Sequence, residues 1–157
     1  RADRSPGEFY HLDMAISFSL ETKYNLKSRT LIKKWLKQII ENKGYKLGTL
    51  SYILCDDDYL LEINKQYLQH EFYTDIITFD YVENGVINGD IFISVDRVKE
   101  NATSFGVSER EELMRVFVHG VLHLSGLKDA TSEEATQMRK AENESLELLK
   151  ELEKHNQ

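Results

Sequence analysis

The stretch Val118-His119-Gly120-Val121-Leu122-His123-Leu124-Ser125-Gly126-Leu127-Lys128-Asp129 decides how the rest of this chain is interpreted. Its two histidines stand four residues apart, and positions i and i+4 lie on one face of a helix. Gly126 can end that helix in the left-handed backbone conformation, which lets the chain turn back. Asp129 would then lie close to both imidazoles. The pattern predicts a central helix that carries a metal site with His119, His123 and Asp129 as ligands.

A simpler interpretation of the histidine pair is a helix with two polar residues at its solvent edge. The neighbouring side chains argue against it, since they are Val116, Phe117, Val118, Val121, Leu122 and Leu124. A helix that is apolar on nearly every side is expected to be buried. Two adjacent buried imidazoles need partners, and a metal ion satisfies both.

Length and composition indicate one folded domain. The chain has 157 residues, of which 41% are hydrophobic and 10% aromatic. No run of about 18 apolar residues is present, so we expect no contact with a membrane. The single cysteine, Cys55, has no disulfide partner, which fits a cytoplasmic protein. The net charge of −7 argues against a strong non-specific nucleic-acid binder, but an enzyme could still meet RNA through a local basic patch or a bound metal.

Residues 1–13 differ from the rest of the chain. They contain the only proline and show no periodicity, and Met14 follows them at the start of a strand-like run. We expect residues 1–13 to be a leader that precedes the native start at Met14. His11 is therefore not counted as a functional residue, and residues 14–157 are expected to form a single domain.

Hydrophobic periodicity predicts a compact α+β domain, in which about four strands form a mixed sheet that packs with about five helices. The strands are expected at 14–20, 47–55, 76–82 and 89–94. Helices are expected after Ser28, after the carboxylates at 56–58, after Ser94, after the capping box that opens at Ser108, and from Thr131 or Ser132. The three carboxylates at 56–58 could bind a metal, but we expect them to cap the helix that follows.

A divalent metal held by His119, His123 and Asp129 would leave a coordination position for water. The expected attacking group is this metal-bound water, since the metal lowers its pKa. In zinc proteases a glutamate follows the first histidine and acts as the general base, whereas this chain has Gly120. That difference argues against peptide hydrolysis. It favours phosphodiester hydrolysis, which can rely on metal-bound hydroxide and charge stabilisation.

Three further blocks precede the histidine stretch, and all four together resemble one family. They are Ile63-Asn64-x-x-Tyr67, Tyr73-Thr74-Asp75-Ile76-Ile77-Thr78-Phe79 and Gly89-Asp90-Ile91-Phe92-Ile93-Ser94. Their order is similar to that of the YbeY family of bacterial endoribonucleases. The resemblance implies an α+β fold and one divalent metal ion, usually assigned as zinc (Zn²⁺), bound by three ligands of the signature. His119 and His123 match the first two.

The resemblance also implies a function. It is single-strand-specific, metal-dependent endoribonuclease activity in ribosomal RNA maturation, at the 3′ end of the small-subunit RNA, and in ribosome quality control. Single-stranded ribosomal RNA and the ribosome or its small subunit are the partners implied. No cofactor other than the metal is expected. Two alternatives remain: a ribosome-assembly binding factor with a structural metal, and a hydrolase of some other substrate, including peptides.

Three positions depart from the family pattern. Asp129 stands where a third histidine is common, Leu68 stands where many relatives carry an arginine, and Tyr73 replaces a proline. A carboxylate oxygen is an acceptable zinc ligand, although a harder one. Leucine cannot stabilise charge on a phosphate, so another side chain would have to assist the metal-bound water. The candidates are Lys65, His70, Arg97 and Lys128.

Overall fold

The computed structural model of the protein describes residues 15–155, so the leader predicted at 1–13 lies outside the described residues. The strands in chain order are β1 (Ile16–Leu20), β2 (Lys46–Cys55), β3 (Ile76–Asp80) and β4 (Val86–Ser94), and their order in the sheet is β1-β2-β4-β3. β2 pairs in parallel with β1 and β4, while β3 and β4 are antiparallel. The predicted α+β class with a four-stranded mixed sheet is confirmed.

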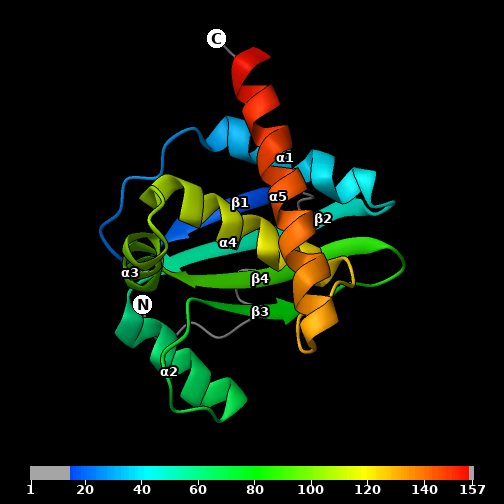
Figure 1. Cartoon of the computed structure of the whole chain (residues 1–157). Helices are drawn as coiled ribbons and strands as arrows, with labels where there is room; N and C mark the ends of the chain where they lie inside the picture. The colour runs from blue at the N-terminus through cyan, green and yellow to red at the C-terminus, as the bar shows by residue number, and fades with distance from the viewer. Residues whose placement is uncertain (1–14, 156–157) are drawn as a thin grey trace.

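Five helices accompany the sheet within the described residues, as predicted. They are α1 (Arg29–Asn42), α2 (Asp57–Leu68), α3 (Val95–Phe105), α4 (Glu109–Leu124) and α5 (Ser132–His155). Figure 1 shows α4 lying over one face of the sheet and α5 crossing in front of it. α5 contacts both α1 and α4, so it forms an outer layer above the helices that cover this face.

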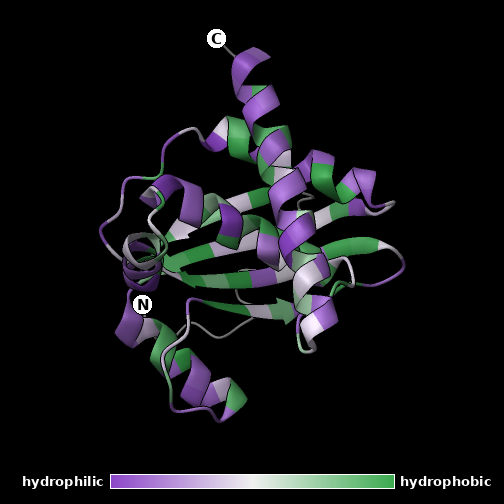
Figure 2. Ribbon diagram, viewed as in Figure 1, coloured by the Kyte–Doolittle hydropathy of each residue, from purple (hydrophilic) through white to green (hydrophobic). Residues whose placement is uncertain are grey.

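The sheet buries side chains on both faces. On the face of α1 and α4, Ile91 and Ile93 of β4 belong to the main core cluster. On the opposite face, Phe92 packs in a second cluster with Leu60 and Ile63 of α2. Because β4 is covered on both sides, its apolar residues are consecutive instead of alternating. Figure 2 shows hydrophobic colours along the central strands and hydrophilic colours over most of α5.

Helix caps fix where several of the helices begin. The Asp56 side chain accepts the Tyr59 backbone N–H at 2.8 Å and caps α2 as predicted, while Asp57 and Asp58 lie in the first turn of that helix. Ser108 accepts the Glu111 N–H at 3.0 Å and starts α4. At α5, Thr131 and Glu134 form a reciprocal capping box, with side chain to backbone distances of 3.0 and 3.1 Å.

The start of β4 differs from the prediction. The strand expected at 89–94 already begins at Val86, directly after a turn in which Asn84 has φ 53° and Gly85 has φ 75°. Asn88 and the two residues before it therefore lie inside the strand and not ahead of it. The Asn88 side chain accepts the Thr49 N–H at 2.8 Å, where the pairing of β2 with β4 shifts register. The Asn88 side chain therefore accepts a backbone N–H that a β-bulge inside the sheet would leave without a ladder partner.

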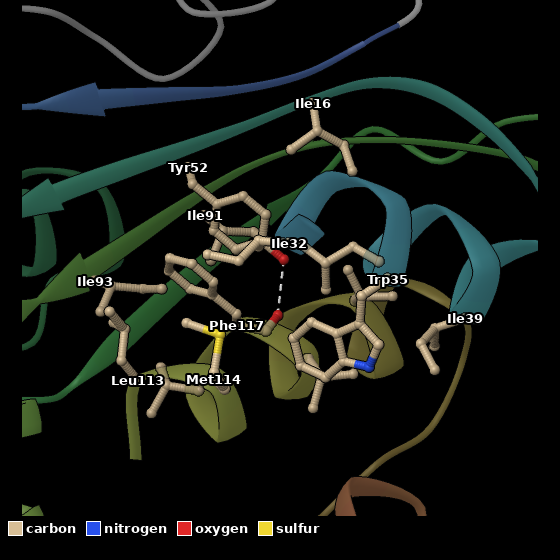
Figure 3. Packing of buried hydrophobic residues seen from close by; sticks show 14 of the residues in the cluster. Ile16, Ile32, Trp35, Ile39, Tyr52, Ile91, Ile93, Leu113, Met114 and Phe117 are labelled. Atoms are coloured by element: carbon tan, nitrogen blue, oxygen red, sulfur yellow. Dashed lines mark hydrogen bonds between the residues drawn. The ribbon is translucent and has the colours of Figure 1, made fainter. Parts of the chain in front are cut away.

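Two buried hydrogen bonds connect the layers. The Tyr52 hydroxyl on β2 donates to the Phe117 carbonyl on α4 at 2.7 Å (Figure 3). The indole N–H of Trp35 on α1 donates to the Ser145 carbonyl on α5 at 2.8 Å. Both rings are fully buried. These bonds fix α4 on the sheet and α5 on α1, and so they position the two helices that build the candidate site.

Cys55 is a packing residue. It is free and buried, its thiol donates to the Ile93 carbonyl at 3.4 Å, and burial raises its pKa. This agrees with the expectation of a cysteine without a disulfide partner. Across residues 15–155, every helix is too short or too polar to span a membrane.

Candidate metal centre

The three predicted ligands lie together at the C-terminal end of α4. The His119 and His123 rings have their centroids 4.6 Å apart. The Asp129 Oδ2 atom is 3.4 Å from His119 Nε2 and 3.5 Å from His123 Nε2. One potential ligand atom from each residue lies within 4.8 Å of the other two. These three side chains form a group that could hold a metal ion.

The way α4 ends brings Asp129 to the histidines. Gly126 has φ 101°, a left-handed conformation that glycine adopts without a steric penalty. Its N–H donates to the His123 carbonyl at 2.9 Å, and the Leu127 N–H donates to the Leu122 carbonyl at 3.0 Å. This pair of bonds is the Schellman motif. It reverses the chain within a few residues, as the sequence predicts.

Gly120 lets α4 approach the sheet closely. A Cβ atom at this position would lie 2.7 Å from Ile91 Cδ1 and 3.3 Å from Ile76 Cδ1. Position 120 therefore faces the sheet and not the metal group. The absence of a protease-type glutamate here has a structural cause, because a side chain at this position would enter the contact between helix and sheet.

Glu142 of α5 stands behind His119. Its side chain is 6% exposed. Its Oε2 atom accepts a hydrogen bond from His119 Nδ1 at 2.6 Å, and its Oε1 atom accepts one from Arg115 Nη1 at 3.0 Å. Arg139 Nη1 is 3.7 Å from the same Oε1. Glu142 thereby joins a predicted ligand on α4 to two guanidinium groups.

The charge of Glu142 sets the protonation of this pair. Burial alone would lower the pKa of His119, but the hydrogen bond and the charge of Glu142 outweigh it and raise that pKa. Burial would likewise raise the pKa of Glu142, but hydrogen bonds from His119 and Arg115 hold it below its ordinary value. A carboxylate that accepts from Nδ1 leaves Nε2 as the nitrogen available to a metal. The donor set and its outer support therefore fit a divalent ion such as zinc.

The metal group opens into a cavity of about 720 Å³. Its lining comes from the ends of α2 and α3, the loop before β3, β3 itself, α4 and α5, and it includes Leu68, His70, Phe72, Asp75, Phe105, Glu112, Arg115, His119, His123, Asp129, Arg139 and Glu142. Burial raises the pKa of Asp75, and burial followed by the charge of Asp75 raises that of Glu112. This volume is within the usual range for ligand sites.

The proposed assistants of catalysis lie in different places. His70 lines the cavity. Lys65 pairs with Glu62 at 3.7 Å, and Lys128 is exposed. Arg97 donates to the Asp57 carboxylate through its Nε and Nη2 atoms, at 3.0–3.1 Å. Within the described residues, the lining of the cavity includes His70 but not these other three side chains.

The sequence interpretation missed Glu142, Arg115 and Arg139. Glu142 lies four residues from both Met138, which is buried, and Leu146, which packs against the main core cluster. A lone carboxylate within an apolar stripe is a signal for a buried, paired charge. Its partner His119 is 23 residues away in the sequence, so periodicity alone could not identify the pair.

The fold and the site define an α+β protein with a group that could hold a metal ion, and two of the three residues of that group lie on one helix. The model of the family described as endoribonuclease YbeY matches residues 16–150. A Cytophaga hutchinsonii protein named endoribonuclease YbeY is 48% identical over 134 residues, which is 85% of this chain and 94% of that protein. One of the same name from Flavobacterium psychrophilum is 46% identical over 85% of this chain and 96% of its own. This chain belongs to the YbeY family, which confirms the resemblance seen in the sequence.

A solved structure agrees with the fold. The solution structure of a Thermotoga maritima protein is 27% identical in sequence and superposes with a TM-score of 0.61. The match covers 90% of this chain and 93% of the other. The arrangement of one mixed sheet with its helices is thus shared with an experimentally determined structure.

Proposed function

We propose that this protein is a zinc-dependent, single-strand-specific endoribonuclease that acts on ribosomal RNA. The observation that carries the proposal is the His119, His123 and Asp129 group at an open cavity, in a chain whose family is described as endoribonuclease YbeY. Its place of action would be the 3′ end of the small-subunit RNA, together with quality control of the ribosome in the cytoplasm. The ribosome or its small subunit is then the particle that presents the RNA.

The three ligands give the site its electrostatic character. Two neutral imidazoles and one carboxylate would leave a divalent ion with one net positive charge, compared with two for three histidines. When bound, the ion would supply Lewis acidity at a phosphoryl oxygen and make a water molecule more acidic. The Asp129 carboxylate moderates both effects, and its hard oxygen widens the range of metals that the site can accept.

Residues that contact the predicted ligands from outside the metal group fix the orientation of the site. Glu142 accepts a hydrogen bond from His119 Nδ1 and so fixes the orientation of the ring. Arg115, with a side chain that is only 16% exposed, is held by its hydrogen bond to Glu142. The Arg139 side chain is 56% exposed and lines the cavity. We propose that Arg139 contacts the RNA phosphates, a contact that Leu68 cannot make.

The test uses protein stripped of metal and reloaded with zinc, with an oligoribonucleotide of the small-subunit 3′ end as substrate. The reloaded protein is expected to cleave the single-stranded form, while the stripped protein and the His123→Ala variant are not. His155→Ala is the matched control, because His155 is exposed at the end of α5. Equal cleavage by the His123→Ala and reloaded proteins would identify a contaminating nuclease and overturn the proposal.

The same variants separate the enzyme from a ribosome-assembly binding factor. In cells that lack the native protein, His123→Ala protein is expected to leave the small-subunit 3′ end unprocessed. If that variant folds, binds ribosomal particles and restores processing, the function is binding and the metal is structural. Circular dichroism of the purified variant establishes that the fold is intact.

A further inference from the structure

Exposed apolar side chains gather beside the metal group. The large apolar residues exposed among the described residues are Leu68 (40%), Phe72 (56%), Tyr73 (50%), Tyr81 (36%) and Phe105 (61%). Leu68, Phe72 and Phe105 line the same cavity as His119, His123 and Asp129. Single exposed apolar residues are ordinary, but a group that lines a polar cavity marks a binding surface.

We propose that Leu68, Phe72 and Phe105 form a base-binding subsite that takes one unpaired nucleobase of the RNA. The inference rests on the proposed function and adds the feature of the RNA that this site recognises. An exposed aromatic ring stacks on any base, because every base has a π-face. The bases of a duplex are already stacked and paired, so only a single strand can place a base here.

The ring of Phe72 is held in place before any ligand binds. His70 stacks against it with ring centroids 5.0 Å apart and an angle of 22° between the planes. The buried Asn64 side chain donates to the Phe72 carbonyl at 2.8 Å, and the His70 N–H donates to the Asn64 carbonyl at 3.1 Å. Asn64 thus anchors the loop at both residues. A fixed aromatic surface loses little conformational entropy when a base stacks on it.

Leu68 and Phe105 complete the subsite from two other elements. Leu68 is the last residue of α2, and Phe105 is the last residue of α3. Leu68 is 40% exposed and gives this part of the cavity an apolar surface, which suits contact with a base and not with a phosphate.

The cavity also provides the groups that a nucleotide needs next to its base. Arg115 and Arg139 line it, as does the predicted metal group. Glu142 is bonded to Arg115 and His119, and Asp129 faces both imidazoles, so these two carboxylates are paired with side chains of the site. Asp75, Asp80 and Glu112 also line the cavity. An apolar subsite beside cationic groups is complementary to a base and its phosphate. The volume of about 720 Å³ is sufficient for both.

The experiment measures KM for cleavage and Kd for binding, with zinc-loaded protein and short single-stranded RNAs. In each RNA one nucleotide in turn is replaced by an abasic residue. With wild-type protein, one abasic position is expected to raise Kd about 5- to 150-fold. In the Phe72→Ala and Phe105→Ala variants Kd for intact RNA is expected to rise by a similar factor, and the abasic replacement is expected to have little further effect.

Matched variants distinguish stacking from apolar contact and from loss of folding. Phe105→Trp is expected to keep the affinity, whereas Phe105→Leu is expected to lose it. Tyr81→Ala removes an exposed aromatic side chain that lies outside the cavity lining, and it is expected to bind like wild type. Thermal melting and zinc affinity should be unchanged in all of these proteins.

The outcomes separate this proposal from the proposed function. If zinc-loaded wild type binds RNA without cleaving it, the nuclease assignment fails while Kd still tests the subsite. If Phe72→Ala and Phe105→Ala bind intact RNA within twofold of wild type, the subsite is refuted even though cleavage proceeds. If the abasic penalty persists in full in these variants, the base binds elsewhere. Wild-type protein that does not bind single-stranded RNA at all would overturn both proposals.

Discussion

Replacing Glu142 by glutamine would remove the charge behind His119 while keeping the shape of the side chain. In the native chain, one carboxylate oxygen accepts from His119 Nδ1 at 2.6 Å and the other accepts from Arg115 at 3.0 Å. A glutamine has only one terminal oxygen, so it cannot accept from both. In either orientation, one donor then faces an NH₂ group. If that donor is His119 Nδ1–H, the ring is driven toward the tautomer that places its proton on Nε2, where the metal should bind.

The expected effect is a loss of metal affinity. Residues that orient a ligating histidine through its second nitrogen are typically worth about 10- to 100-fold in metal binding, which corresponds to about 1.4–2.8 kcal/mol. If the glutamine oxygen stays on His119, Arg115 loses its acceptor instead. Because the Arg115 side chain is only 16% exposed, that loss should lower the free energy of unfolding of the metal-free protein by about 1–3 kcal/mol.

The assay is competition for zinc between the protein and a chromophoric chelator at neutral pH. Glu144→Gln is the matched control, because Glu144 lies on the same helix and is exposed. We expect Glu144→Gln to bind zinc like wild type and Glu142→Gln to bind it at least tenfold more weakly, within the range above. Equal zinc affinity in the two variants, together with an equal free energy of unfolding of the metal-free proteins, would show that Glu142 positions neither His119 nor Arg115, whatever the effect on activity.

Two further predictions concern the core and the cavity. Tyr52→Phe removes the 2.7 Å hydrogen bond to the Phe117 carbonyl and should lower the free energy of unfolding in urea by about 0.5–1.5 kcal/mol; an unchanged value would mean that this bond contributes nothing net. Burial, and after it the charge of Asp75, raises the pKa of Glu112. The fold therefore favours the protonated carboxyl, and the stability that this carboxyl contributes is lost as pH rises through the raised pKa. Glu112→Gln should therefore raise the free energy of unfolding of the chelator-treated protein at neutral pH, but not at a pH below the ordinary carboxyl pKa. Glu111 is exposed, so Glu111→Gln is the control, and an equal gain in stability in that variant would contradict the prediction.

Much of this fold could be predicted because its signals are local. The periodicity of apolar residues and the cap at Asp56 depend on neighbours a few residues apart. The candidate metal group could also be predicted, since His119, His123 and Asp129 lie on one helix and the turn that follows it. Asn88 shows where such reasoning fails. It lies just before the strand predicted at 89–94, and only the pairing of β2 with β4 shows that it belongs to that strand and places its side chain over a bulge.

The partners of charged side chains could not be predicted in the same way. Arg97 was a candidate for catalysis, but its guanidinium group is bound to Asp57, which lies 40 residues earlier in the chain. Glu142 was not among the predicted site residues, yet it is buried against His119. Which charges meet depends on how the helices cross, and that is decided by packing contacts that no local pattern contains.

The geometry of the metal group therefore depends on contacts in the core. α4 is fixed against the sheet by the close approach at Gly120 and by the hydrogen bond from Tyr52. α5 is fixed on α1 by the bond from Trp35 to the Ser145 carbonyl, within one turn of Glu142. The His119 ring is held between these two helices. A displacement of about 1 Å in a supporting residue is enough to weaken a site of this kind. The buried hydrogen bonds of Tyr52 and Trp35 therefore help to hold His119 in the geometry of the candidate metal group.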